Sequence, residues 1–390
     1  MADFENIPKD MLQEITKFLS IPDYIRFGAV CSHWLEVIKE GYYSPHKQLP
    51  WLIFFDIESP RVFNPLDEKV YRIELPELHQ RHCAGSSHGW FITIDLNLNI
   101  NLLNLFSKNQ VKLPQLPFDA SDVWPRLYYE CFWSKWPEER RDQLIYKAVL
   151  SADPCKNSDY TVMAIYCCNF KLAFWRAGDI TWTVIDSDFV LQDIIWFNDA
   201  FYVVGSKINS HDDSILQSMK KYLVNFMGDL LLVYRSIAPA EVYEGYYNES
   251  SSDEDEADDY PNQGNDNGAL KYYQCGVDTM EFLRTDGFML FKLDQKENKF
   301  VELKNINGHV LFLGSNHAVF TPTTTLAEKM EDNFIYFSDD YECANHMYGY
   351  RDSGVYNMRD KSITFPLNNI FHQVKQPTFI DINPDTFRFV

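Results

Sequence analysis

The chain has 390 residues, of which 46% are hydrophobic and 16% aromatic, and its formal charge at pH 7 is −21. This length exceeds the about 250 to 300 residues that one hydrophobic core usually supports, so we expect two domains or a closed repeat array with an appendage. An acidic chain repels the phosphates that dominate binding to nucleic acids and anionic lipids. We therefore expect no nucleic acid and no membrane among its partners.

The N-terminus and the cysteines indicate a soluble protein of a reducing compartment, the nucleus and/or the cytoplasm. Residues 1–10 carry acidic side chains where a signal peptide has positive charge, and no apolar run approaches the roughly 18 residues that span a membrane. The eight cysteines lack the C-x-x-C spacing of zinc sites, so we interpret them as buried thiols. Cys167 and Cys168 fall in a strand-like run, where neighbours point to opposite faces, which indicates a structural role.

Helical periodicity dominates only between Asn6 and Lys39. Pro8 suits the first turn of a helix, and Pro22 with Asp23 ends that helix and starts the next. The first helix carries an apolar stripe at helical spacing, formed by Met11, Leu12, Ile15, Phe18 and Leu19. With two shorter helices after it, the segment predicts a compact three-helix unit. Such a small unit is not robust alone, so its apolar stripe needs a surface to dock on.

The apolar and proline positions of this unit resemble an F-box. The resemblance rests on Ile7-Pro8, Met11-Leu12, Ile15, Leu19, Pro22-Asp23, Arg26-Phe27, Val30-Cys31 and Trp34. It implies binding to a Skp-type adaptor, which bridges to a cullin. By position, the resemblance implies that the residues facing the adaptor are Ile7, Pro8, Leu12, Ile15 and Leu19. It also implies that three further residues pack the motif and complete its docking surface: Val30, Cys31 and Trp34. A generic helical hairpin that caps the larger domain is the alternative.

From Leu49 onward the sequence is typical of many short strands. Runs of β-branched and aromatic residues alternate with Asn, Asp, Gly and Pro, and a loose two-strand unit recurs at residues 62–76, 103–114 and 287–303. Repeats of about 40 to 50 residues built from four strands indicate a β-propeller, and about 340 residues provide six or seven blades. The predicted fold class is therefore mainly β, with a pair of β-sandwiches as the structural alternative.

The strand region also resembles the plant KIB-type β-propeller family, which is the domain of unknown function 295 family. The similarity is carried by residues 48–52, 87–90, 222–224, 228–233, 288–294, 310–314 and 333–340. That family commonly carries an N-terminal F-box, so the two resemblances support each other. They imply an F-box at residues 1–45 and a KIB-type propeller at residues 46–390.

An acidic, polar insertion at residues 245–268 interrupts the strand pattern. Such a run repels itself and buries nothing, so we expect disorder, and a solvated loop between strands is the plain interpretation. Ser250, Ser251 and Ser252 each precede an acidic residue by three positions, the context that acidophilic kinases prefer. We therefore hypothesise that these serines are phosphorylated, which would add about −1.5 to −2 charges per site.

A second insertion, residues 122–141, combines large aromatic residues with arginine and lysine. This is the composition of binding hot spots, which makes Trp124, Trp133 and Trp136 candidate target-binding residues. The alternative is that these rings pack between blades, because large aromatics bury well.

Two patterns that could indicate an enzyme lack the required context. Residues 85–89 match G-x-S-x-G around Ser87, but a strand follows where a hydrolase needs a helix. His79, His82, Cys83 and His88 follow no recognised zinc spacing. We expect a non-catalytic chain with no cofactor and no metal.

Together the two resemblances imply the substrate-recognition subunit of an SCF-type cullin-RING E3 ubiquitin ligase. In this interpretation the F-box binds the adaptor, and through it a cullin, while the propeller holds an unidentified target protein. The alternative is a propeller scaffold or ligand-binding protein that does not assemble into a ligase.

Overall fold

The structure is a computed structural model that describes most of the strand region and part of the N-terminal helical region. The described residues are 7–16, 19, 27–28, 30–39, 51–54, 61–64, 69–72, 76–104, 109–117, 137–167, 171–207, 219–240, 282–314, 317–325, 331–338, 352–364 and 377–380.

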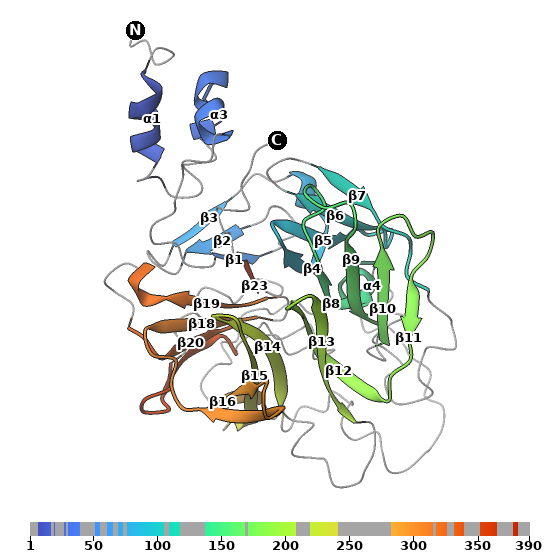
Figure 1. Ribbon diagram of the computed structural model, residues 1–390, viewed down its shortest axis with the longest axis vertical. Helices are drawn as coiled ribbons and strands as arrows, with labels where there is room; N and C mark the ends of the chain where they lie inside the picture. The colour runs from blue at the N-terminus through green and yellow to red at the C-terminus, as the bar shows by residue number, and fades with distance from the viewer. Residues whose placement is uncertain are drawn as a thin grey trace, which may run out of the picture.

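Six sheets are present in the described part of the strand region, and Figure 1 shows them arranged around a ring in chain order. The first sheet has the order β23-β1-β2-β3, with β23 (Pro377–Ile380), β1 (Trp51–Phe54), β2 (Arg61–Asn64) and β3 (Lys69–Arg72). The second has the order β4-β5-β6-β7, with β4 (His82–Ser87), β5 (Trp90–Ile94), β6 (Ile100–Asn104) and β7 (Gln110–Lys112). The third has the order β11-β10-β9-β8, with β8 (Ile145–Leu150), β9 (Thr161–Tyr166), β10 (Lys171–Arg176) and β11 (Thr183–Ile185).

The second half of the ring is less regular than the first. The fourth sheet has two strands in the described part of the chain, β12 (Phe189–Phe197) and β13 (Ala200–Lys207). The fifth has the order β14-β15-β16-β17, with β14 (Lys220–Phe226), β15 (Asp229–Ala240), β16 (Phe282–Asp294) and β17 (Lys299–Leu303). The sixth has the order β19-β18-β20-β21-β22, with β18 (His309–Leu313), β19 (Ala318–Pro322), β20 (Phe334–Phe337), β21 (Gly354–Asn357) and β22 (Ile363–Thr364).

Apolar cores lie between successive sheets rather than inside a single layer. The second and third sheets enclose the largest, which includes Trp90 and Trp175. Three further cores fill the third-to-fourth, fourth-to-fifth and fifth-to-sixth junctions. A sheet that is covered on both faces by its neighbours is the packing of a propeller, in which each blade contacts the next around the ring. The β-sandwich alternative is therefore wrong.

The ring closes through the two ends of the strand region. β23 pairs with β1 in antiparallel register, with Trp51 opposite Ile380 and Phe54 opposite Pro377. The last strand of the chain thus completes the sheet that the first strands begin, which protects backbone groups that an open sheet would leave at its edge.

The two-strand unit that recurs in the sequence forms the outer pair of strands in three of the sheets. Its copies at 62–76, 103–114 and 287–303 contain the antiparallel pairs β2/β3, β6/β7 and β16/β17, which are the third and fourth strands of their sheets. As far as the structure describes them, four sheets have four strands, whereas the sixth has five and includes the parallel pair β18/β20. The fold is mainly β and contains a β-propeller; the count of six or seven blades stays a prediction.

A buried ion pair ties neighbouring sheets together. Lys147 of β8 pairs with Asp193 of β12, and the other carboxylate oxygen of Asp193 accepts the backbone N–H of Leu223 in β14 at 2.6 Å. One carboxylate therefore joins the third, fourth and fifth sheets. The sheets also approach closely: a Cβ at Gly85 would overlap the carbonyl oxygen of Ala148, so only glycine fits there.

Helices are few in the described part of the chain. They are α1 (Lys9–Thr16), α3 (Ser32–Lys39), α4 (Pro137–Leu144) and the short 3₁₀ turns η2 (Pro76–Leu78) and η5 (Thr323–Thr325). None of those in the described ranges has the length and hydrophobicity needed to cross a bilayer.

Candidate functional site

The N-terminal helical unit has its own small core. Its centre consists of Leu12 of α1, Val37 of α3 and Phe27, which lies before α3 in the chain; all three are buried against one another. Three partly buried residues pack around them: Ile7, Leu19 and Trp34. The rings of Phe27 and Trp34 lie with their centroids 4.3 Å apart. Burial of apolar side chains therefore holds α1 and α3 side by side, as Figure 1 shows.

Local hydrogen bonds fix the ends of these helices. The carbonyl oxygen of Pro8 accepts the N–H groups of Met11 and Leu12, so α1 begins directly after the proline. Nε2 of His33 lies 3.1 Å from the carbonyl oxygen of Ile7, which connects the start of α1 to α3. The proline and the histidine thus set how the two helices meet.

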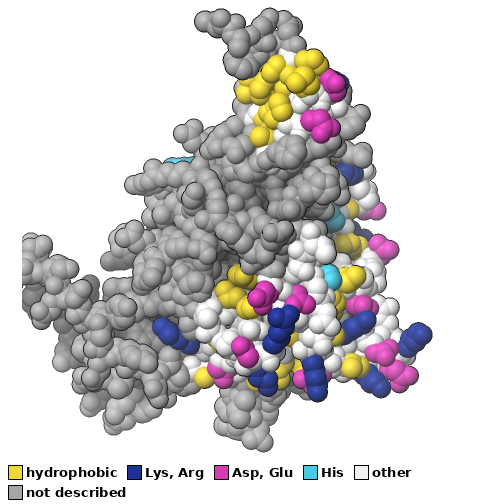
Figure 2. Space-filling view, turned by 90° about the vertical axis from the view of Figure 1, so that its left-hand side faces the viewer, with side chains coloured by type: hydrophobic (Ala, Val, Ile, Leu, Met, Phe, Trp, Pro, Cys, Tyr) yellow, Lys and Arg dark blue, Asp and Glu magenta, His cyan; other side chains and the backbone are white. Residues whose placement is uncertain are grey.

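Among the described residues of the unit, three large apolar side chains remain exposed to solvent. Met11 is 56% exposed, Ile15 41% and Val30 55%. Met11 and Ile15 are four residues apart on α1, so they lie on the same side of that helix. Figure 2 shows hydrophobic side chains gathered at the upper end of the described surface, beside acidic ones. Because Leu12, Phe27 and Val37 pack together inside the unit while these three side chains point to solvent, the exposed side chains can contact another protein.

The eight residues predicted to bind an adaptor fall into different environments. Pro8, Ile15 and Val30 are exposed, and four are half-buried: Ile7, Leu19, Cys31 and Trp34. Leu12 is fully buried within the unit, so the expectation that its side chain faces the adaptor does not fit its position. Leu12 packs the helices together and supports the exposed surface indirectly.

Sequence reasoning left Met11 out of the docking set, although it was part of the apolar stripe. Residues at i and i+1 of a helix point about 100° apart, so Met11 and Leu12 cannot both face the core. Spacing alone does not say which of the two is inside. Leu12 is the buried one, because Phe27 and Val37 pack against its side of α1.

The serine of the hydrolase-like pattern ends a strand of a hairpin. β4 ends at Ser87, His88 and Gly89 turn with φ of 53° and 78°, and β5 begins at Trp90. Oγ of Ser87 donates to the carbonyl oxygen of Leu150 at 3.4 Å. The prediction that Ser87 lacks the strand-to-helix turn of a hydrolase is confirmed.

Of the cysteines among the described residues, Cys83 and Cys167 are buried, Cys31 is half-buried and Cys155 is exposed, so the interpretation of the cysteines as buried thiols is wrong for Cys155. Burial raises the pKa of the Cys83 thiol to about 12, so it stays protonated and unreactive. Cys167 is buried, but β9 ends at Tyr166 and Cys167 has a φ of 63°, so the expectation that it lies within a strand is wrong. Within the described residues, no three histidine, cysteine or acidic side chains are placed to hold a metal ion.

Several predicted features lie outside the described residues. They are Cys168, the acidic insertion at 245–268 with Ser250, Ser251 and Ser252, and the aromatic residues Trp124, Trp133 and Trp136. α4 begins at Pro137, within the second insertion at residues 122–141, and was not predicted.

A helical unit with an exposed apolar patch, joined to a propeller, defines the class of F-box proteins with a β-propeller domain. The F-box family model matches residues 4–41, and the KIB1-4 beta-propeller family model matches residues 54–357. The second match covers most of the chain, so the chain belongs to the KIB1-4 β-propeller family.

Relatives in Arabidopsis thaliana agree with this assignment. The F-box/kelch-repeat protein KIB1 is 22% identical over 91% of this chain and 81% of its own length. The F-box protein SKIP23 is 22% identical over 93% of this chain and 91% of its own length. A further F-box protein is 30% identical, but the match spans only 39% of this chain and 42% of that relative. Among solved structures, the N-terminal domain of Nup159 aligns with a TM-score of 0.21 and 8% identity over 66% of this chain and 47% of that chain, too low to carry an argument.

Proposed function

We propose that this chain is the substrate-recognition subunit of an SCF-type cullin-RING E3 ubiquitin ligase. Its helical unit binds a Skp-type adaptor, and through it a cullin, while the propeller binds a target protein. The observation that carries this proposal is the exposure of Met11, Ile15 and Val30 on a unit in which Leu12, Phe27 and Val37 are buried against one another. The match to the F-box family supports the same partner.

The proposed mechanism is proximity, and it requires no chemistry from this chain. Holding a target on the same assembly as a charged ubiquitin donor makes their encounter intramolecular, which raises the effective concentration of the reacting lysine. The ring suits this role because its third, fourth and fifth sheets are packed on both faces and because the buried ion pairs Lys147–Asp193 and Arg235–Asp352 connect neighbouring sheets. The nucleophile comes from the target and the activated ubiquitin from the donor enzyme.

The adaptor contact is proposed to consist of two parts. Met11 and Ile15 form a ridge along one side of α1, and Val30 adds a second apolar contact just before α3. Pro8, Ile7 and Trp34 border these residues as less exposed contacts. Leu12 supports these contacts indirectly, because its buried side chain packs α1 against Phe27 and Val37.

The proposal is tested by co-expressing the full chain with a plant Skp-type adaptor and measuring the mass of the purified complex by light scattering. A complex with one copy of each protein is expected, and adding the cullin and RING subunits should extend it. If the full chain elutes alone under conditions that assemble an established F-box protein, the ligase role is wrong and a scaffold role takes its place.

Three further properties belong to the same proposal. The target contact includes the aromatic residues of the insertion at residues 122–141, so replacing Trp133 and Trp136 by alanine should weaken target capture without lowering the melting temperature.

Phosphate on Ser250, Ser251 or Ser252 should be visible in the intact mass of protein from its native cells. A fluorescent fusion should locate the chain in the nucleus and/or the cytoplasm.

A further inference from the structure

The outer edge of the third sheet presents backbone that no strand of the described residues covers. β11 pairs with β10 on one side only, with Ala173 opposite Val184 and Leu172 opposite Ile185. Figure 1 shows β11 on the outer rim of the ring. An edge strand offers a row of N–H and C=O groups to which another extended chain can add.

Apolar side chains accompany this edge. Within residues 179–189, Ile180 is 90% exposed, Val184 40% and Phe189 46%. Register places Val184 on the same face as Ala173, toward the second sheet, and Ile185 on the opposite face beside Leu172, toward the fourth sheet. Exposed apolar residues this large, grouped along one segment, are typical of a surface that another protein covers.

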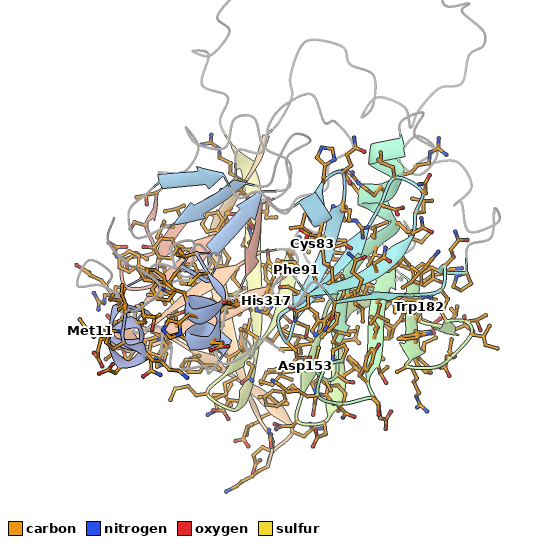
Figure 3. All side chains as sticks on the ribbon, turned by 90° about the horizontal axis from the view of Figure 1, so that it is seen from above. Met11, Cys83, Phe91, Asp153, Trp182 and His317 are labelled. Carbon is orange, nitrogen blue, oxygen red and sulfur yellow. The ribbon has the colours of Figure 1, made fainter. Side chains whose placement is uncertain are left out.

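The segment is held rigidly despite its exposure. Nε1 of Trp182 donates to the carbonyl oxygen of Pro114 at 2.8 Å, and Nε1 of Trp175 donates to the carbonyl oxygen of Asp179 at 2.9 Å. Both indoles are buried, and Figure 3 shows Trp182 at the outer side of the sheet, with Cys83 and Phe91 of the second sheet nearer the centre. A fixed edge costs a partner less ordering entropy than a mobile loop would.

The charge of this edge is of one sign. Residues 179–189 contain Asp179, Asp186 and Asp188, all exposed, and no lysine or arginine. The guanidinium of Arg176, just before the turn, lies 5.6 Å from the centroid of the Phe174 ring. Charge complementarity therefore favours a partner segment that carries lysine or arginine beside its apolar residues.

We propose that β11 binds an extended, positively charged segment of the target protein, which adds to the third sheet as its next strand. This inference rests on the proposed function, because the ligand is taken to be the protein that the propeller presents. Backbone pairing with residues 183–185 supplies the orientation, Val184 and Ile180 supply apolar contacts, and the three aspartates select for basic residues. A competing explanation is that the aspartates only keep this edge from pairing.

The test uses the full chain without any adaptor and a fluorescent peptide of alternating valine and lysine as the probe. Saturable binding by fluorescence polarisation in about 0.15 M salt is expected, where interactions between distant surface charges are screened. The Asp186→Lys plus Asp188→Lys variant should bind about tenfold more weakly or worse, because like charges then face each other. Hydrogen exchange should show new protection at the amides of residues 183–185.

Two controls separate this edge from general attraction to an acidic protein. Glu297→Lys plus Glu302→Lys makes the same change in charge at the exposed β16/β17 hairpin and should leave binding unchanged. A peptide of equal charge with proline in place of alternate valines should bind about tenfold more weakly or worse, because proline cannot donate to the strand ladder. Absence of saturable binding, equal binding by the Asp→Lys variant and the native chain, or protection away from β11 would overturn the inference. The experiment contains no adaptor, so peptide binding and amide protection at β11 can be measured even if the chain does not assemble into a ligase.

Discussion

The guanidinium of Arg235 in β15 donates to the carboxylate of Asp352 at 2.8 Å, and both side chains are buried. The same guanidinium donates to the carbonyl oxygens of Ser338 and Asp352 and to Oγ1 of Thr285, and it lies 4.8 Å from the centroid of the Phe337 ring. One side chain therefore joins the fifth sheet to the sixth, where the strand order is least regular.

Arg235→Met should destabilise the propeller by about 3 to 5 kcal/mol, because it leaves the buried Asp352 carboxylate without the guanidinium that balances its charge. Urea unfolding followed by tryptophan fluorescence measures the change. As a control, Arg359→Met removes an exposed cation that contacts Glu331 and Asp332 and should change the free energy of unfolding by about 1 kcal/mol or less. Equal effects of the two substitutions would show that the Arg235 network does not hold the sheets together.

The hairpin between β4 and β5 is tied to the third sheet by Trp90. Its Nε1 donates to Oδ1 of Asp153 at 2.8 Å, and the ring is buried. Trp90→Phe keeps most of the apolar burial and removes this donor, so we expect a loss of about 1 to 3 kcal/mol from the hydrogen bond and the smaller ring. Asp153→Asn retains an acceptor and should cost less. A Trp90→Phe protein as stable as the native chain would contradict this assignment.

His317 gives the protein a specific dependence on pH. Desolvation of this half-buried ring, with a smaller contribution from the charge of Lys147, lowers its pKa from 6.5 to about 4. Figure 3 shows His317 in the interior of the ring. As the pH falls from 6.5 towards 4, the unfolded chain binds a proton that the folded chain does not, so the free energy of unfolding falls. His317→Gln should lose less stability than the native chain over this interval, and parallel stability curves would contradict the prediction.

Leu12 and Met11 are neighbours with opposite roles, which a pair of alanine substitutions separates. Leu12→Ala removes a fully buried side chain and should cost the helical unit about 2 to 5 kcal/mol. Met11→Ala removes an exposed side chain and should leave that stability nearly unchanged. Hydrogen exchange at residues 9–16 of the full chain reports the difference. Faster exchange in the Met11 variant than in the Leu12 variant would reverse the assignment of inside and outside.

The propeller was largely predictable from local sequence patterns. The three recurring two-strand units coincide with antiparallel pairs because alternating apolar residues and turn residues encode a hairpin within a few positions. The parallel pair β18/β20 and the closing pair β1/β23 join segments distant in sequence, and no local pattern encodes such pairing. The buried ion pair between Lys147 and Asp193 was also not predicted, because a charged residue in a strand is expected to face solvent unless the position of its partner is known.

The candidate site was predicted in identity but only partly in detail. The F-box spacing located the helical unit, yet the side of α1 that faces solvent depends on Phe27 and Val37, which pack against it from later in the chain. The exposed edge at β11 was missed because Ile180, Val184 and Phe189 look like ordinary strand residues. The exposure of Val184 follows from the position of β11 at the edge of its sheet, whereas Ile180 lies in the turn before β11 and Phe189 at the start of β12.

The most direct test of the account is the affinity of the full chain for a plant Skp-type adaptor, measured by calorimetry for the native chain and two charge-matched variants. Met11→Asp plus Ile15→Asp should weaken binding by about a hundredfold or more, since burying unpaired charge costs several kcal/mol, without changing the thermal unfolding of the propeller. Met227→Asp plus Val301→Asp introduces the same charge at exposed apolar residues of the propeller and should bind like the native chain. Equal binding by all three proteins, or none by the native chain, would contradict the account.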